Sequence, residues 1–396
     1  MLRRALKFVF DNSLALLVGA IAGVVWANAD LDSYNAFAGA NLASYWDAAL
    51  TGGNGPEFFD LRYLVNDVLM AFFFALAGKE VWEAMLPGGP LHDRRRAAVP
   101  ILCALGGMAG PAVIYVAGAL ALGRVDQLGR GWAIPCATDI AFSYLIARLV
   151  FGRYHSATAF LLLLAIADDA FGLIILALFY PVKHVEPAWL LITAGAVVLA
   201  LVLRRMHVRS IWWYLIFPGT LSWAGLALSG LHPALGLLPI IPALPHGRTA
   251  EGVIWEPSDR PDALARLEAI WKRPVEIILG LFGLLNAGVG FSAFGATSYL
   301  VAGGLVIGKP VGIFVTGVIV VAVFRLELPQ GVRWRELAVI GCAAGIGFTV
   351  ALFVATVAFA PGLIQDEAKM GALASAFAVI TAVAAARILR VKRTTQ

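Results

Sequence analysis

The stretch ATAFLLLLAIADDAFGLIILALF, residues 157–179, is an almost unbroken apolar run with two adjacent carboxylates, Asp168 and Asp169, at its midpoint. As a helix rising about 1.5 Å per residue, it can cross a hydrocarbon core about 30 Å thick, and both acids then lie near the middle. One aspartate at the centre of a spanning helix costs about 2.5–3.5 kcal/mol even on the lenient insertion scale. Two in succession therefore indicate a functional requirement at this depth.

The composition of the whole chain is that of a polytopic membrane protein. Of its 396 residues, 60% are hydrophobic and 14% are charged, whereas soluble domains carry about 25% charged residues. The formal net charge is +5, but the basic residues lie in short loops between apolar runs, so we expect membrane lipid and not nucleic acid as the partner. The three cysteines lie in apolar segments without CxxC spacing, so we expect neither a resident metal nor a disulfide framework, and no cofactor.

Twelve apolar segments predict a single all-α membrane domain over residues 1–396, with about twelve transmembrane helices. The segments are 8–29, 63–86, 97–122, 132–150, 157–179, 188–203, 211–228, 231–244, 272–286, 299–324, 337–359 and 368–388. We expect two longer loops, at 31–61, which is rich in Asn, Gly and acidic residues, and at 245–267, which is basic.

The distribution of basic residues predicts the orientation in the membrane. Arg and Lys are concentrated in the loops after even-numbered segments and in both termini, which places both termini and loop 245–267 in the cytoplasm and loop 31–61 in the periplasm. The first segment also has the pattern of a secretory signal, because basic residues precede an apolar stretch that ends at Ala27-Asn28-Ala29. A retained first helix is favoured over a cleaved signal, because an even number of spans then places both termini on the basic side.

Two segments are interrupted near their centres. Segment 132–150 has a proline shortly before Thr138 and Asp139, and proline removes a backbone hydrogen bond and disfavours helix before it. Segment 337–359 has three glycines shortly before Thr349, and glycine permits unwinding or close helix approach. Interrupted helices at matching positions of two halves are the best sequence indication of a transporter's substrate site. We therefore expect inverted repeats, formed by the third to fifth and the tenth to twelfth segments.

A lysine, Lys309, lies in mid-membrane within segment 299–324. An interrupted helix leaves helix ends inside the membrane, positive at N-termini and negative at C-termini. Asp139 is placed to neutralise the first kind of end, and Lys309 the second. Each feature alone has a structural explanation, namely a tolerated proline kink, small-residue helix packing or a structural Asp–Lys pair. Three acids and one lysine at mid-membrane, together with two matched breaks, favour a transport site.

The two adjacent acids also indicate the kind of transport. Neighbouring helix residues point about 100° apart, so Asp168 and Asp169 face two neighbouring directions from one helix. Two such carboxylates repel each other, and either bound protons or a bound cation relieves that repulsion. Carboxylate and hydroxyl oxygens suit a small hard cation. Competition between protons and a cation for one site, open alternately to each face of the membrane, gives obligatory exchange.

Several motifs carry a family resemblance. They are GWAIPCATDIAF at 131–142, AIADD at 165–169, ALFY at 177–180, IGKPVGI at 307–313 and CAAGIGFT at 342–349, with shorter matches ND at 66–67, SGLH at 229–232 and NAGV at 286–289. These segments resemble the NhaA family of sodium/proton antiporters. The matches follow the same order along the chain and span about residues 60–360. The resemblance implies an electrogenic, pH-regulated antiporter of the bacterial cell inner membrane that exchanges cytoplasmic Na⁺ or Li⁺ for external protons, for sodium and pH homeostasis.

The resemblance also implies a fold and roles for the core residues. It implies twelve helices, of which the fourth and eleventh are broken and cross each other. By family analogy Asp169 is the principal ligand of the transiently bound sodium ion. Asp168 is a proton carrier paired with Lys309, and together with Asp169 it forms the transient sodium site. Thr138 and Asp139 lie at the helix crossing beside the site.

The same analogy implies roles outside the core. Glu80 and Glu268 would lie near the cytoplasmic entrance, where the family is thought to sense pH. Asp67 would lie towards the periplasmic half of the second segment, and His232 is grouped with these entrance or pH-response residues. The resemblance further implies a homodimer formed through residues 40–60.

The sequence departs from the family pattern mainly at the entrance. Lys79 stands where the family usually has an apolar residue, and the residues that follow Glu80 lack the usual basic pair. The family histidines around Glu268 are absent, and Glu276 adds an acid inside segment 272–286. Antiport therefore rests on intact core motifs, whereas pH regulation rests on a region that has diverged.

Two other classes of membrane protein also carry acids inside the membrane or bind sodium there. An intramembrane aspartyl protease would carry a GxGD-type motif and place its two acids on two helices, whereas here Ala167 precedes Asp168 and one segment carries both acids. The chain is therefore not predicted to be an enzyme. A sodium-coupled symporter of an organic solute on a related fold is the alternative. It would need further polar side chains near the crossing, where the sequence offers mainly Thr138, Thr349 and Cys136.

Overall fold

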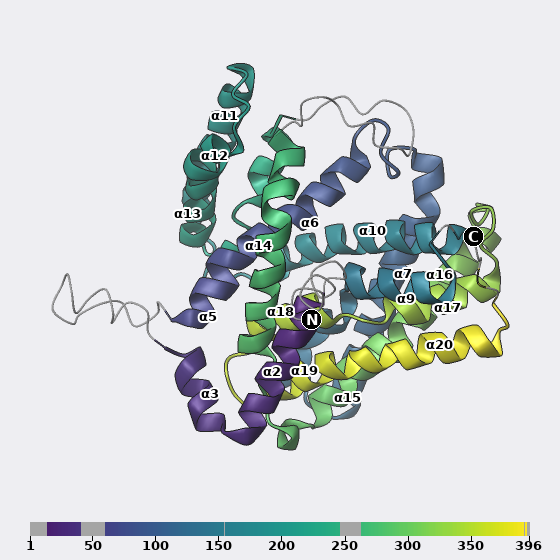
Figure 1. Ribbon diagram of the computed structural model, residues 1–396. Helices are drawn as coiled ribbons and strands as arrows, with labels where there is room; N and C mark the ends of the chain where they lie inside the picture. Colours follow the sequence, from purple (N-terminus) through teal and green to yellow (C-terminus); the bar gives the residue numbers. More distant parts are fainter. Residues whose placement is uncertain (1–13, 41–59, 154, 246–262, 392, 394–396) are drawn as a thin grey trace, which may run out of the picture. The chain divides into compact units, whose positions relative to one another are not determined.

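The computed structural model describes residues 14–40, 60–153, 155–245, 263–391 and 393, and every secondary-structure element in these ranges is a helix (Figure 1). This confirms the all-α prediction. Within the described ranges, seven helical stretches are long and apolar enough to cross a membrane, and nine if each of two bent pairs counts as one span. The proposed dimer contact at 40–60 lies almost wholly outside the described residues.

The chain forms two compact units, the first from residues 1–83 and 176–290 and the second from residues 84–175 and 291–396. The helices of the first unit are α2 (Ala15–Ala29), α3 (Leu31–Ala38), α5 (Leu61–Tyr63), η1 (Leu64–Leu69), α6 (Met70–Met85, whose last two residues belong to the second unit), η3 (Pro187–Trp189), α11 (Leu190–Arg205), α12 (Ile211–Tyr214), η4 (Leu215–Gly219), α13 (Thr220–Ser229), η5 (Pro233–Leu235), η6 (Leu238–Ala243) and α14 (Ala263–Asn286).

The second unit contains both interrupted helices. Its elements are α7 (Arg94–Ala121), α8 (Val125–Leu128), η2 (Gly129–Cys136), α9 (Ile140–Val150), α10 (Ser156–Phe179, whose last four residues belong to the first unit), η7 (Phe291–Ala293), α15 (Ala296–Gly303), η8 (Gly304–Gly308), α16 (Lys309–Ala322), α17 (Trp334–Ala344), α18 (Phe348–Ala358), α19 (Leu363–Ala374), η9 (Ser375–Phe377) and α20 (Ala378–Ile388). Of the elements labelled η, η1, η4 and η8 are π-helical turns, and the others are 3-10 turns.

Each of the twelve predicted segments contains helix in its described part, but three details of the prediction were wrong. Segment 231–244 consists of 3-10 turns, because its prolines remove the backbone donors that an α-helix needs. The predicted loop at 31–61 begins with a helix, α3, whose N-terminus is capped by Asp30 accepting a hydrogen bond from the Ser33 amide at 3.0 Å. The third detail is the start of α14.

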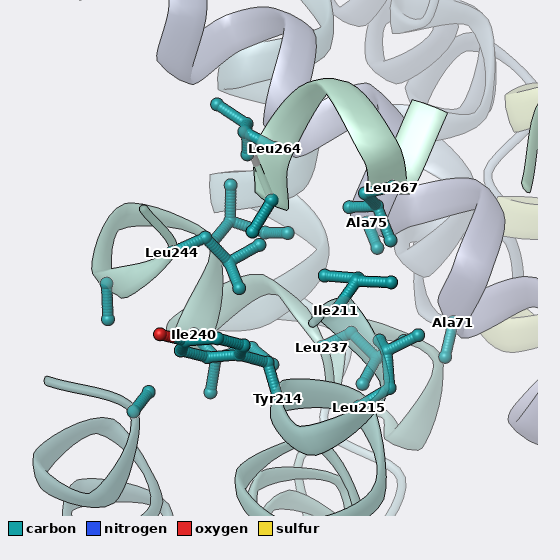
Figure 2. Close-up of a cluster of buried hydrophobic side chains, with 14 residues drawn as sticks. Ala71, Ala75, Ile211, Tyr214, Leu215, Leu237, Ile240, Leu244, Leu264 and Leu267 are labelled. Atoms are coloured by element: carbon teal, nitrogen blue, oxygen red, sulfur yellow. The ribbon is translucent and has the colours of Figure 1, made fainter. Parts of the chain in front are cut away.

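Helix α14 begins at Ala263, inside the predicted basic loop 245–267. Its first turns carry Leu264 and Leu267, each 1% exposed, which belong to a buried apolar cluster with residues of α6, α12 and η6 (Figure 2). Burial of a leucine side chain contributes about 1.5–3 kcal/mol. This packing extends the helix through a segment whose charge suggested a loop.

Glycines bring helices into close contact inside each unit. In the first unit, Gly19 of α2 faces the carbonyl of Gly280, and Gly283 of α14 faces the carbonyl of Leu16, so a Cβ at either glycine would overlap backbone. In the second unit, α7 packs in the same way against η8 and α16, through Gly106 and Gly110 on one side and Gly308 and Gly312 on the other. The contact at Gly308 fixes the backbone at the residue before Lys309.

Candidate functional site

The two predicted interruptions are confirmed, and they meet inside the second unit. The first lies between the stretch Val125–Cys136 (α8 and η2) and α9, with a bend of 49°, and the second lies between α17 and α18, with a bend of 48°. The amide of Asp139 donates to the carbonyl of Ile346 at 2.7 Å. The Thr138 hydroxyl donates to the carbonyl of Ala344 at 3.4 Å, and the Ser143 hydroxyl donates to that of Ala343 at 2.9 Å. Each break therefore satisfies backbone groups that the other leaves open, as is required within a membrane.

Asp139 caps two helices at once. Its side chain is 5% exposed, and Oδ1 accepts a hydrogen bond from the amide of Phe142 at 3.3 Å, in the first turn of α9. Oδ2 accepts from the amide of Thr349 at 3.2 Å, in the first turn of α18, and also from the Thr349 hydroxyl. One carboxylate thus lies at the positive ends of both interrupted helices, where negative charge is stabilised.

Lys309 occupies the opposite electrostatic position. It is the first residue of α16, directly after the π-turn η8, and its side chain is fully buried. Its Nζ atom donates to the backbone carbonyl of Cys136, the last residue of η2, and lies 2.8 Å from Oδ2 of Asp168. The ammonium group therefore compensates both the negative end of a broken helix and a buried carboxylate.

The local sequence explains how a lysine reaches this position. Gly304 packs against Pro135 of η2, and Gly308 packs against Pro111 of α7, where a Cβ would overlap in both cases. These two glycines begin and end η8, so the backbone before Lys309 lies directly against the first broken helix and α7. Such π-turns are rare, and they frequently lie at functional sites.

The two acids of α10 have different surroundings. Asp168 is 1% exposed, and its Oδ1 atom is buried without a hydrogen-bond partner among the described residues. Asp169 is partly exposed. A buried carboxylate oxygen without a partner costs free energy that a bound proton or cation would recover. The site therefore offers one acid held by a lysine and a neighbouring acid that is open to more solvent.

The predicted entrance and pH-response residues all lie in the first unit. The Lys79 side chain is 2% exposed, and its Nζ lies 2.5 Å from Oε2 of Glu268 and 2.7 Å from Oε2 of Glu83. Glu80, the next residue along α6, is exposed. The structure thus brings Glu268 together with Lys79, a partnership that the sequence did not predict.

Asp67 and His232 approach each other in the same unit. Asp67 lies within the π-turn η1, and its Oδ1 atom is 3.8 Å from Nδ1 of His232. His232 is buried and accepts a hydrogen bond through Nδ1 from the amide of Ala234 at 3.2 Å. Next to Asp67, the side-chain amides of Asn66 and Asn286 form two reciprocal hydrogen bonds of 3.0 and 2.8 Å.

Sequence reasoning missed the contact of Ser143 with the second break and the ion pair between Lys79 and Glu83. Ser143 lies four residues after Asp139, on the same face of α9, and this spacing could have indicated its contact with the second break. Lys79 and Glu83 have the same spacing on α6, which could have indicated their ion pair. Nothing local could indicate that Glu268 also contacts Lys79.

An all-helical membrane fold in which two broken helices meet beside buried charges is typical of secondary transporters. The family model described as Na⁺/H⁺ antiporter 1 matches residues 4–389. The chain is 49% identical to the Na⁺/H⁺ antiporter NhaA of Jannaschia sp. strain CCS1, over 98% of this chain and 99% of that one. It is 44% identical to the NhaA of Geobacter sulfurreducens, over 99% of this chain and 100% of that one. The chain therefore belongs to the NhaA family of Na⁺/H⁺ antiporters, as its motifs predicted.

Among the solved structures that align with this chain is that of the sodium proton antiporter MjNhaP1 of Methanocaldococcus jannaschii, with a TM-score of 0.49 and 15% identity over 99% of both chains.

Proposed function

We propose that this protein is a secondary antiporter that exchanges cytoplasmic Na⁺ or Li⁺ for external protons across the bacterial inner membrane. The observation that carries the proposal is the ion pair between Lys309 and Asp168, fully buried, with one Asp168 oxygen lacking a hydrogen-bond partner among the described residues. Family membership supports the same activity, because the relatives are named as Na⁺/H⁺ antiporters.

The charges of the site give a mechanism for competition. With both acids ionised and Lys309 protonated, Asp168, Asp169 and Lys309 together carry one net negative charge, which either a sodium ion or a proton neutralises. In the proposal Asp169 is the principal sodium ligand and Asp168 is the proton carrier whose carboxylate alternates between Lys309 and a proton. In the proposal Asp169 carries one proton, and either Asp168 or Lys309 carries a second. Two protons then move against one sodium ion, so each cycle moves net charge and exchange is electrogenic.

The residues of the crossing have a supporting role. Thr138 and Asp139 hold the two breaks together and neutralise the helix N-termini, so the negative field of Asp168 and Asp169 remains available to the cation. Thr138 is 1% exposed, and its hydroxyl oxygen is the kind of ligand that a small hard cation accepts.

The remaining parts of the proposal concern access and assembly. Both termini lie in the cytoplasm on the charge distribution of the loops. The family resemblance supports two further roles. The first is a role at the entrances or in the response to pH, for Glu80, Glu268, Asp67 and His232. The second is a homodimer that forms through residues 40–60.

A vesicle assay separates the antiporter from the symporter. Everted membrane vesicles that contain the protein are acidified by respiration, and Na⁺, Li⁺ and K⁺ are added in turn while a pH-sensitive dye reports the internal pH. We expect alkalinisation of the interior with Na⁺ or Li⁺ and none with K⁺. If no cation produces a response, the antiporter proposal is wrong and the sodium-coupled symporter takes its place.

A further inference from the structure

The first turns of α19 contact the outer ends of two helices that lead to the site, α15 and α18. Glu367 is 8% exposed, and its Oε2 atom accepts a hydrogen bond of 2.9 Å from the amide of Thr297, in the first turn of α15. Two residues earlier, the side-chain amide of Gln365 donates to the carbonyl of Phe359 at 2.7 Å and to that of Thr356 at 3.3 Å, at the C-terminal end of α18. The Glu367 carboxylate thus accepts from the N-terminus of α15, and the Gln365 amide donates to the C-terminus of α18.

Further contacts make the joint between α19 and α15 close. The Ser298 hydroxyl donates to the backbone carbonyl of Glu367 at 2.7 Å and accepts from the amide of Gly295 at 3.1 Å. A Cβ at Gly295 would overlap the Glu367 carboxylate, and a Cβ at Gly371 would overlap the Ser298 carbonyl. The chain therefore has its smallest residue at the two points where these helices touch most closely.

Both helices lead to the site, α15 through η8 at its C-terminal end and α18 at its N-terminal end. Lys309 follows Thr297 along α15 and η8, about 18 Å further on at the rise of a helix. Thr349, which donates to Asp139, lies in the first turn of α18, whose other end is held by Gln365. A single turn of α19 consequently connects α15, which leads through η8 to Lys309, with α18, whose first turn donates to Asp139.

We propose that Glu367 is a positioning residue for the transport site. Through its hydrogen bond to Thr297 it fixes α15 along its axis relative to α18, and so holds the Lys309 ammonium group in register with Asp168 and the carbonyl of Cys136. Gln365 holds the α18 side, and we call Glu367 and Gln365 together the clamp. The inference rests on the proposed roles of Lys309 and Asp168. Without the clamp, the arrangement that binds sodium is a smaller fraction of the population, and apparent affinity falls in proportion.

The test compares Glu367→Ala with two other substitutions. Glu367→Gln keeps an oxygen that can accept from the Thr297 amide. Glu336→Ala is a matched control, because Glu336 also caps a helix in this unit, accepting from the Arg333 amide at 3.0 Å, but only within its own helix start. Half-saturating sodium and the maximum rate are measured in everted vesicles, and the amount of folded protein is measured by size-exclusion chromatography.

We expect Glu367→Ala to raise half-saturating sodium at least about threefold with a smaller change in maximum rate, and Glu367→Gln and Glu336→Ala to stay within about twofold of the wild type. If folded Glu367→Ala keeps the wild-type value, or if Glu367→Gln is impaired equally, the proposal is wrong. Should Glu367→Ala not fold, Ser298→Ala replaces it, and an unchanged half-saturation there overturns the proposal. A wild type without any sodium response would instead overturn the proposed function.

Discussion

The Nζ atom of Lys309 lies 2.8 Å from Oδ2 of Asp168, and neither side chain has any exposed surface. Removing both groups from water carries a desolvation cost of several kcal/mol per ion, which the attraction between them offsets only with good geometry. A buried ion pair of this kind is therefore poor evidence for stability alone. Its position beside two broken helices is better explained by a site that must accept and release charge.

Lys309→Ala separates the structural and transport roles of this pair. The variant leaves the Asp168 carboxylate buried without its cation, so we expect a loss of about 3–5 kcal/mol in stability. We expect altered coupling of protons to sodium more than complete loss of exchange. Thermal unfolding of purified protein and the vesicle assay measure the two effects. The double variant Lys309→Ala, Asp168→Asn should recover much of the stability, and a single variant as stable as the wild type would contradict the account.

Thr349→Val tests the contact between the two breaks. Valine keeps the shape of threonine but removes the hydroxyl that donates to Asp139, so that, of residue 349, only the amide still donates to Oδ2 of Asp139. We expect a loss of about 1–3 kcal/mol in stability, as for a buried charged acceptor that loses one donor. The matched control is Thr356→Val in the same helix, because the Thr356 hydroxyl donates to the nearby Phe353 carbonyl at 2.7 Å, a bond within one helix turn. Equal thermal midpoints for the two variants would rule out a special role for Thr349.

Lys79 and Lys272 allow a paired test in the first unit, because both approach Glu268. Lys79 is 2% exposed and lies 2.5 Å from Glu268, whereas Lys272 is 72% exposed and lies 3.8 Å away. Exposed ion pairs contribute about 0–1 kcal/mol, and burial of one partner increases the cost of breaking the pair.

We therefore expect Lys79→Met to lower the thermal midpoint clearly and Lys272→Met to leave it almost unchanged. Combining Lys79→Met with Glu268→Gln should reduce the loss in part, because one of the two carboxylates that lose Lys79 is then removed. A Lys79→Met midpoint equal to that of Lys272→Met would show that the buried lysine does not hold α6 to α14.

The charged residues of the site could be predicted from the sequence because a charge inside an apolar run must be compensated. This argument identified Asp139 for the helix N-termini and Lys309 for a C-terminus, and the structure places both groups there. The interruptions could be predicted for a related reason, since proline and clustered glycines disturb the backbone locally.

The partners across long sequence distances could not be predicted in this way. Glu268 follows Lys79 by 189 residues, and no periodicity connects the two. The beginning of α14 was missed because Leu264 becomes buried only when residues of α6 and η6 pack against it. Glu367 was missed because an acid near a helix start is ordinarily a local cap, and only the fold shows that it caps another helix.

The central claim is that Asp169 is the acid that binds the transported cation, and Asp169→Asn tests it most directly. Asparagine keeps the size of the side chain but removes its charge, so the variant should insert into the membrane in normal amounts. In everted vesicles we expect the sodium-dependent movement of protons to disappear, while the exposed acid variant Asp32→Asn in α3 keeps the wild-type response. Sodium-dependent exchange that survives in Asp169→Asn would contradict the assignment of the site.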